Sequence, residues 1–182
     1  MKFDNYTIRL PIHEDSEKFF LLIENNRNRL GDFFATTLSK TKTLDDTIIF
    51  MSEKLTRLKE KTYYPFLIID NSTENIVGFI DVKNIEWKIP KGELGCFLDA
   101  KYIGKNISKK ALSIVIRHVF NELKFRKLFL RTHETNTSAR KLAESCGFEI
   151  EGHLRADHKT SEGKIVDLLY YGLLSPVNSN IQ

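Results

Sequence analysis

The residues best suited to carry chemistry lie between positions 92 and 111. There a strand-like run passes into a tight loop, and the loop opens directly into a long helix. Gly104 and Asn106 tolerate left-handed backbone conformations, which lets consecutive N–H groups point inward. Together with the helix N-terminus and the lysines at 105, 109 and 110, these amides would bind an anion such as a diphosphate. Strand–turn–helix units are also common without any ligand, so the segment by itself fits an ordinary connection too.

The composition excludes several classes of protein. The net charge is +4 over 182 residues, but the lysines are scattered and no nucleic-acid motif accompanies them, so we expect no nucleic-acid partner. The N-terminus lacks the apolar core of a signal peptide and no apolar run reaches membrane-span length, so a cytoplasmic location is the default expectation. Cys96 and Cys146 do not indicate a disulfide framework, and the five histidines show no metal-ligand spacing, so no metal site is predicted.

The elements that must position these residues follow from hydrophobic periodicity. Apolar residues at helical spacing predict four helices, at 13–30, 45–61, 108–123 and 137–145. Asp15 or Ser16 can cap the first helix, and Gly147 ends the last. Alternating or continuous apolar runs predict strands at 6–10, 66–69, 76–82, 94–98, 128–130, 148–154 and 165–174. Turns are expected at 70–73 and 161–164, and the polar segment 31–43 is expected to join the first two helices.

This order predicts an α+β fold, an α/β sandwich of one sheet covered by helices. Residues 1–175 are expected to form a single domain, and residues 176–182 a flexible tail.

Three stretches of the chain resemble the Gcn5-related N-acetyltransferases (GNAT), and within them the RimJ/RimL-like branch that acetylates ribosomal-protein alanines. The first is Glu-Leu-Gly-Cys-Phe-Leu-Asp at 93–99, leading into Gly-Lys-Asn-Ile at 104–107. The second runs from Asn136 to Cys-Gly-Phe at 146–148, and the third covers 149–155, 162–167 and the last strand. The resemblance implies a mainly antiparallel central sheet with helices on both faces, and acetyl-CoA as co-substrate.

The resemblance also implies where acetyl-CoA would lie. Its pantetheine arm would pair with the strand that ends at Phe97 and Leu98, and Asn136 would face it across a gap between strands. Its diphosphate would rest on the amides of Gly104, Lys105, Asn106, Ile107, Ser108 and Lys109. Two features depart from the family pattern. The usual Gln/Arg-x-x-Gly-x-Gly/Ala loop has Ile103, Asn106 and Ser108 at its marked places, and Ala139 stands where relatives carry a serine proposed to protonate the leaving thiolate.

Several side chains are candidates for moving the proton of the acceptor amine. Glu93 lies on the central strand near the expected acetyl group, where it would act as base or would only orient the substrate. His158, beside Asp157, falls near a catalytic Glu proposed for relatives, and imidazole suits proton transfer near neutral pH. One of Tyr170 and Tyr171 is expected to face the site, and Tyr171 is taken as the candidate. His133 and Glu134 are expected to be strand-end polar residues; the aromatic candidates for the acceptor entrance are Phe33, Phe34 and Trp87.

The sequence therefore predicts an acetyl-CoA-dependent N-acetyltransferase that acts on a primary amine by direct attack, with the α-amine of a protein as the leading acceptor. The alternatives are a small amine (an antibiotic, a polyamine or an amino acid) and a non-catalytic acyl-CoA-binding module. We expect no membrane partner, and the sequence leaves a homodimer open.

Overall fold

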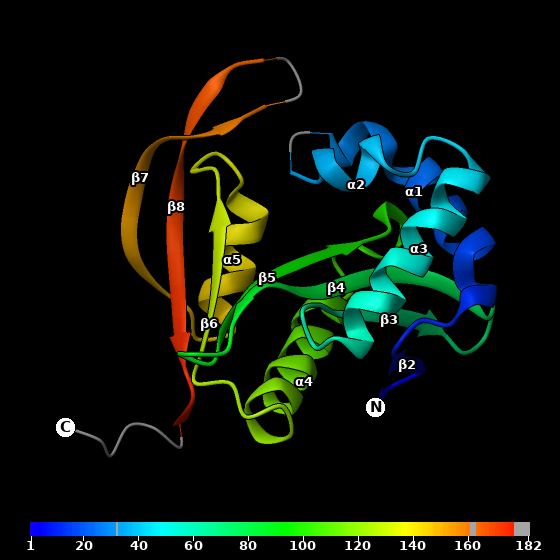
Figure 1. The fold of residues 1–182 in the computed structure, drawn as a ribbon, viewed down its shortest axis with the longest axis horizontal. Coiled ribbons are helices and arrows are strands. Elements are labelled where there is room, and N and C mark those ends of the chain that lie inside the picture. The colour runs from blue at the N-terminus through cyan, green and yellow to red at the C-terminus, as the bar shows by residue number, and fades with distance from the viewer. Residues whose placement is uncertain (32, 161–162, 177–182) are drawn as a thin grey trace.

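An eight-stranded sheet forms the centre of the protein in a computed structural model that describes residues 1–31, 33–160 and 163–176 (Figure 1). The strand order is β1-β2-β3-β4-β5-β6-β8-β7, and all neighbours are antiparallel except β5 and β6. The predicted mixed, mainly antiparallel sheet is therefore confirmed. The strands are β1 (Lys2–Phe3), β2 (Tyr6–Arg9), β3 (Tyr64–Asp70), β4 (Asn75–Glu86), β5 (Lys91–Leu98), β6 (Lys127–Thr132), β7 (Glu149–Lys159) and β8 (Ile165–Leu174).

Helices cover both faces of this sheet, and each face has its own hydrophobic core (Figure 1). The core beneath α4 and α5 includes Ala111, Leu112 and Val115, whereas the core beneath α1 and α3 includes Phe19 and Phe50. Because side chains alternate along a strand, β5 contributes Leu94 and Leu98 to the first core and Phe97 to the second. The helices are η1 (His13–Asp15), α1 (Ser16–Leu30), α2 (Ala35–Ser39), α3 (Leu44–Lys59), η2 (Ala100–Tyr102), α4 (Ile107–Asn121) and α5 (Thr137–Ser145).

All predicted helices and strands are present, and the elements that were not predicted are short. The bounds of α5 and β8 agree with the prediction, and the other predicted elements begin or end a few residues away from it. The segment 31–43, predicted only to join the first two helices, contains α2, and β1 was not predicted. Asp15 precedes α1, but its carboxylate binds Arg9 instead of capping the helix. The expected tail and part of the turn at 161–164 lie outside the described residues.

The parallel strands β5 and β6 pair over a short stretch and then diverge, and this parting positions the site. The two strands pair only at Lys91, Gly92 and Glu93 of β5. Beyond Glu93, β5 continues against β4 as far as Leu98, while β6 continues against β8. The free edge of β5 therefore offers backbone groups to a gap in the sheet.

Among the described residues, no helix is both long and apolar enough to cross a membrane.

Candidate active site

A cavity of about 1090 Å³ occupies the gap between β5 and β6. One wall carries Phe97, Leu98 and Ser108, and the opposite wall carries Asn136 and other residues at the start of α5. The cavity extends to the other face of the sheet, where α1, α2 and α3 also line it. It therefore connects the two faces of the molecule.

The loop before α4 has the backbone conformation expected of an anion site. Gly104 has φ +81° and Asn106 has φ +61°, so both predicted left-handed residues are left-handed. In α4 the N–H of Lys110 donates to the carbonyl of Asn106 at 3.2 Å. The amides of residues 107–109 precede that bond and have no carbonyl partner within the helix, so they are available to oxygen atoms of a ligand.

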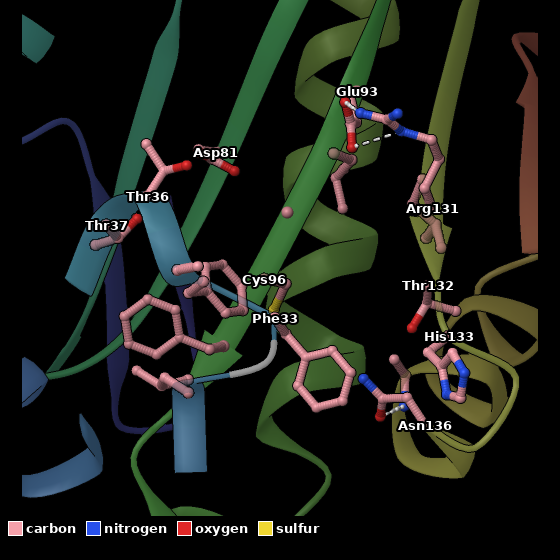
Figure 2. A pocket seen from close by; sticks show the side chains of 18 of the residues that line it. Phe33, Thr36, Thr37, Asp81, Glu93, Cys96, Arg131, Thr132, His133 and Asn136 are labelled. Atoms are coloured by element: carbon pink, nitrogen blue, oxygen red, sulfur yellow. Dashed lines mark hydrogen bonds and ion pairs between the residues drawn. The ribbon is translucent and has the colours of Figure 1, made fainter. Parts of the chain in front are cut away.

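Residues predicted to hold the pantetheine arm lie on both walls of the cavity, with Phe97 and Leu98 on β5 and Asn136 at the start of α5. Figure 2 shows Cys96 on β5 and Asn136 at the start of α5, with Phe33 between them. Asn136 Oδ1 accepts from the N–H of Ala139 at 3.2 Å, which fixes the side chain and leaves its Nδ2 as a donor. A long, partly apolar arm fits this passage, and a diphosphate fits the helix start beyond it. Burial raises the pKa of the Cys96 thiol to about 12, so Cys96 packs as a neutral group.

Glu93 lines the cavity, but its carboxylate is fully engaged. Its Oε2 accepts from Arg131 Nη2 at 3.0 Å and from Asn84 Nδ2 at 2.6 Å, and its Oε1 faces Arg131 Nε at 3.3 Å (Figure 2). Arg131 also pairs with Asp157 at 3.0 Å. These contacts favour the orienting role over the role of base, because both oxygens already accept hydrogen bonds.

His158 and the two tyrosines lie in different surroundings. His158 lines the same cavity as Glu93, as do Asp157 and His133. Tyr171 is fully buried on the α5 face, where its hydroxyl donates to Glu144 at 2.9 Å. Tyr170 stacks on Phe129, with 5.0 Å between ring centroids. The structure thus places His158 with Glu93 and places neither tyrosine among the residues that line the cavity.

The three aromatic residues predicted for the acceptor entrance lie in two different places. Phe33 and Phe34 both line the cavity, and Phe34 packs edge-on against Phe97 at 5.0 Å. Trp87 packs instead against Phe125 at 5.1 Å and donates its indole N–H to the carbonyl of Lys61. Trp87 therefore belongs to the packing between β4 and the end of α4.

Asp81 is the residue of this cavity that sequence reasoning missed. It lies on β4 directly opposite Gly95 of β5 and is only 5% exposed. Tyr63 donates its hydroxyl to Oδ2, while Oδ1 has no hydrogen-bond partner among the described residues. Burial and this carboxylate raise the pKa of Tyr63. A carboxylate within an apolar strand, opposite a glycine, is the signal that could have found it.

The sequence matches known acetyltransferases over most of its length. Residues 5–149 match the acetyltransferase (GNAT) domain family. A putative ribosomal N-acetyltransferase, YdaF, from Bacillus subtilis is 31% identical over 94% of this chain and 92% of its own. A spermidine N(1)-acetyltransferase from Vibrio cholerae is 21% identical over 75% of each chain.

The fold matches solved structures of the same kind. A ribosomal-protein-S5-alanine acetyltransferase from Vibrio fischeri has a TM-score of 0.88 at 20% identity, covering 97% of this chain and 96% of its own. RimL, a ribosomal L7/L12 α-N-protein acetyltransferase solved with coenzyme A, has a TM-score of 0.87 at 15% identity, covering 94% of this chain and 95% of its own. The family match, the parted strands and the amides at the start of α4 lead to one conclusion: this chain belongs to the GNAT acetyltransferases and uses acetyl-CoA as co-substrate.

Proposed function

We propose that the protein acetylates the α-amine at the N-terminus of a protein substrate. The observation that supports this most is the cavity that passes through the sheet where β5 and β6 part. Acetyl-CoA would enter along the α4 and α5 side, and the acceptor would enter between α1, α2 and α3. The two substrates then meet beside β5 without competing for the same surface.

The reaction sets the chemical demands on this site. The ammonium must first lose a proton, which is easier for an α-amine with pKa about 8 than for a lysine-like amine with pKa about 10.4. The nitrogen lone pair then forms a bond to the acetyl carbon as the carbon–sulfur bond breaks, and the second proton from nitrogen goes to the departing sulfur. A backbone N–H near Phe97 or Leu98 on the free edge of β5 would stabilise the negative charge that develops on the carbonyl oxygen.

Different residues of the chain would carry out different steps of this reaction. Glu93, held by Arg131 and Asn84, would fix the rim of the cavity at the last paired position of β5. His158 remains our candidate for relaying the proton, because it lines the cavity on β7. Because Ala139 offers no hydroxyl at that position, a water molecule would carry the proton from nitrogen to the departing sulfur; a thiol pKa near 8.5 makes this feasible.

The departures in the loop fit acetyl-CoA binding rather than its loss. Asn106 already adopts the left-handed conformation that a glycine would take. Since the diphosphate would be held by backbone N–H groups, the change of side chain leaves those donors in place.

A matched set of acceptors tests the proposal. Acetyl-CoA would be incubated with a short peptide that has a free α-amine, with the same peptide blocked at its α-amine but carrying one lysine, and with spermidine. We expect thiol release with the first peptide, and mass spectrometry to place the acetyl group on its α-amine. Turnover on spermidine or lysine but not on the α-amine would contradict the proposal.

A further inference from the structure

The wall of the cavity between α3 and β4 carries four charged side chains, Lys54, Arg57, Asp81 and Lys83, which we call the α3–β4 cluster. Lys54 and Arg57 lie one turn apart on α3, and Asp81 and Lys83 lie on the same face of β4. Tyr63 links the two elements. Its ring centroid lies 4.1 Å from Lys54 Nζ and 5.0 Å from Arg57 Cζ, and its hydroxyl donates to Asp81.

The four members of this cluster form no ion pair in the described part of the chain, although the charge of Asp81 acts on Lys54. Three positive groups therefore surround one buried carboxylate, and one oxygen of that carboxylate accepts no hydrogen bond from the described residues. A native buried polar atom without a partner calls for an explanation, and a ligand is one of the few available.

The acidic groups beside the cluster form ion pairs with other residues, although the charge of Glu53 also acts on Lys54 and Arg57. Glu53, beside Lys54 on α3, pairs with Lys40 at 2.9 Å. Glu93, opposite Lys83 in the sheet, pairs with Arg131. Burial, and next to it the charge of Arg57, lower the pKa of Lys54 to about 8. A ligand carboxylate placed beside the three cations would offset their mutual repulsion, whereas further cations without a carboxylate would add to it.

Asp81 lies where an acceptor amine would need a partner. Its Oδ1 lies 2.4 Å from the position that a Cβ at Gly95 would occupy, so glycine alone leaves room for the carboxylate beside β5. Gly95 is two residues beyond Glu93, the last position at which β5 pairs with β6. Lys83 Nζ lies 3.4 Å from the same Cβ position, so positive charge flanks this point.

From this arrangement, and resting on the proposed function, we infer that the acceptor is an amine with a carboxylate close by, such as a protein N-terminus followed by acidic residues. Asp81 Oδ1 accepts a hydrogen bond from the acceptor's amine and orients it toward the acetyl group. Lys54, Arg57 and Lys83 bind the carboxylate. A polyamine is disfavoured because its additional ammonium groups would meet these three cations.

The test compares acceptors that differ only in charge. The kcat/KM values for acetyl transfer would be measured with Ala-Asp-Glu, Ala-Ser-Gln and Ala-Lys-Lys peptides amidated at their C-termini, with free aspartate, and with spermidine. We expect the acidic peptide to exceed the basic one at least tenfold. In Arg57→Gln the ratio of acidic to neutral peptide should fall several-fold, whereas in Lys59→Gln, an exposed lysine near the end of α3, it should stay as in wild type. Asp81→Asn should lower kcat/KM for every acceptor and leave that ratio unchanged.

The outcomes separate this inference from the function on which it rests. Stabilisation by CoA in a thermal melt would show that each variant folds. Equal use of acidic and basic peptides would overturn the inference while the α-amine function stands. Turnover of free aspartate alone, with the same dependence on Arg57, would keep the inference and overturn the protein acceptor. A preference for spermidine, or an acidic preference unchanged in Arg57→Gln, would overturn the inference.

Discussion

At the scale of single residues, the position of Glu93 on the central strand could be predicted from the sequence, but its role could not. Its place on the central strand was predictable, because the run 93–99 identifies that strand. Its partners were not, because Arg131 reaches it from β6, 38 residues later in the chain. Contacts between residues so far apart depend on the tertiary fold.

Replacing Glu93 with glutamine would distinguish an orienting role from that of a base. The amide keeps the shape but weakens the bonds to Arg131, so we expect a free energy of unfolding lower by about 1–3 kcal/mol. We expect kcat/KM to fall with no change in the shape of its pH profile or in CoA affinity. A pH profile that loses its acidic limb in Glu93→Gln would show that Glu93 is the base after all.

Asp81 could not be assigned a role from the sequence alone. It stands within an otherwise apolar run that predicts a buried strand, and a single carboxylate there indicates no chemistry by itself. Its significance comes from Tyr63, 18 residues earlier, and from Gly95 on the next strand. Both contacts exist only once the sheet has formed.

Lys54 gives the acceptor site a predictable pH dependence. Its pKa of about 8 is below the ordinary value for lysine, so its positive charge is present below pH 8 and is lost as the pH rises through 8. The preference for an acidic over a neutral peptide should therefore decline between pH 7 and 9. In Lys54→Met that preference should be smaller at pH 7 and should change little over the same range.

The ratio between two peptides is the right measurement, because both α-amines titrate near pH 8 and their common effect cancels. A wild-type ratio that rises with pH would contradict the assignment of Lys54.

At the scale of elements, hydrophobic periodicity predicted the long helices and the strands but did not predict the short elements. The helix α5 was predicted with its bounds because Gly147 ends it, and the structure shows that Asn136 caps its start. The five-residue helix α2 has no side-chain cap, and its first flanking residue is Phe34. Its position depends on Phe34 packing against Phe97, which the local sequence does not reveal.

The loop before α4 offers a matched pair of substitutions. A Cβ at Gly104 would meet nothing within 4 Å, so Gly104→Ala adds only the strain of a left-handed backbone, about 1–2 kcal/mol. We expect this variant to melt at a lower temperature and to bind CoA more weakly. Asn106→Gly relieves a similar strain at φ +61°, so it should bind CoA as tightly as wild type or more tightly.

Isothermal titration with CoA measures both effects, and Gly104→Asn serves as the control because asparagine tolerates this conformation better than alanine. A large loss of affinity in Asn106→Gly would mean that the Asn106 side chain, not its backbone, contacts the ligand.

At the scale of the whole molecule, the decisive feature is that the sheet parts between β5 and β6. The order of elements predicted a helix-covered sheet, but three paired positions followed by divergence cannot be deduced from apolar patterns. In the proposed function the parting would give each substrate its own side of the sheet, with the amides of α4 on one side and the α3–β4 cluster on the other.

The most direct test of this account is a crystal structure of the protein with CoA and an acidic N-terminal peptide. We expect the pantetheine arm along the free edge of β5, the diphosphate on the amides of residues 104–109, and the peptide amine beside Asp81. CoA bound outside the gap between β5 and β6, or a peptide amine on the α5 side of the sheet, would contradict it.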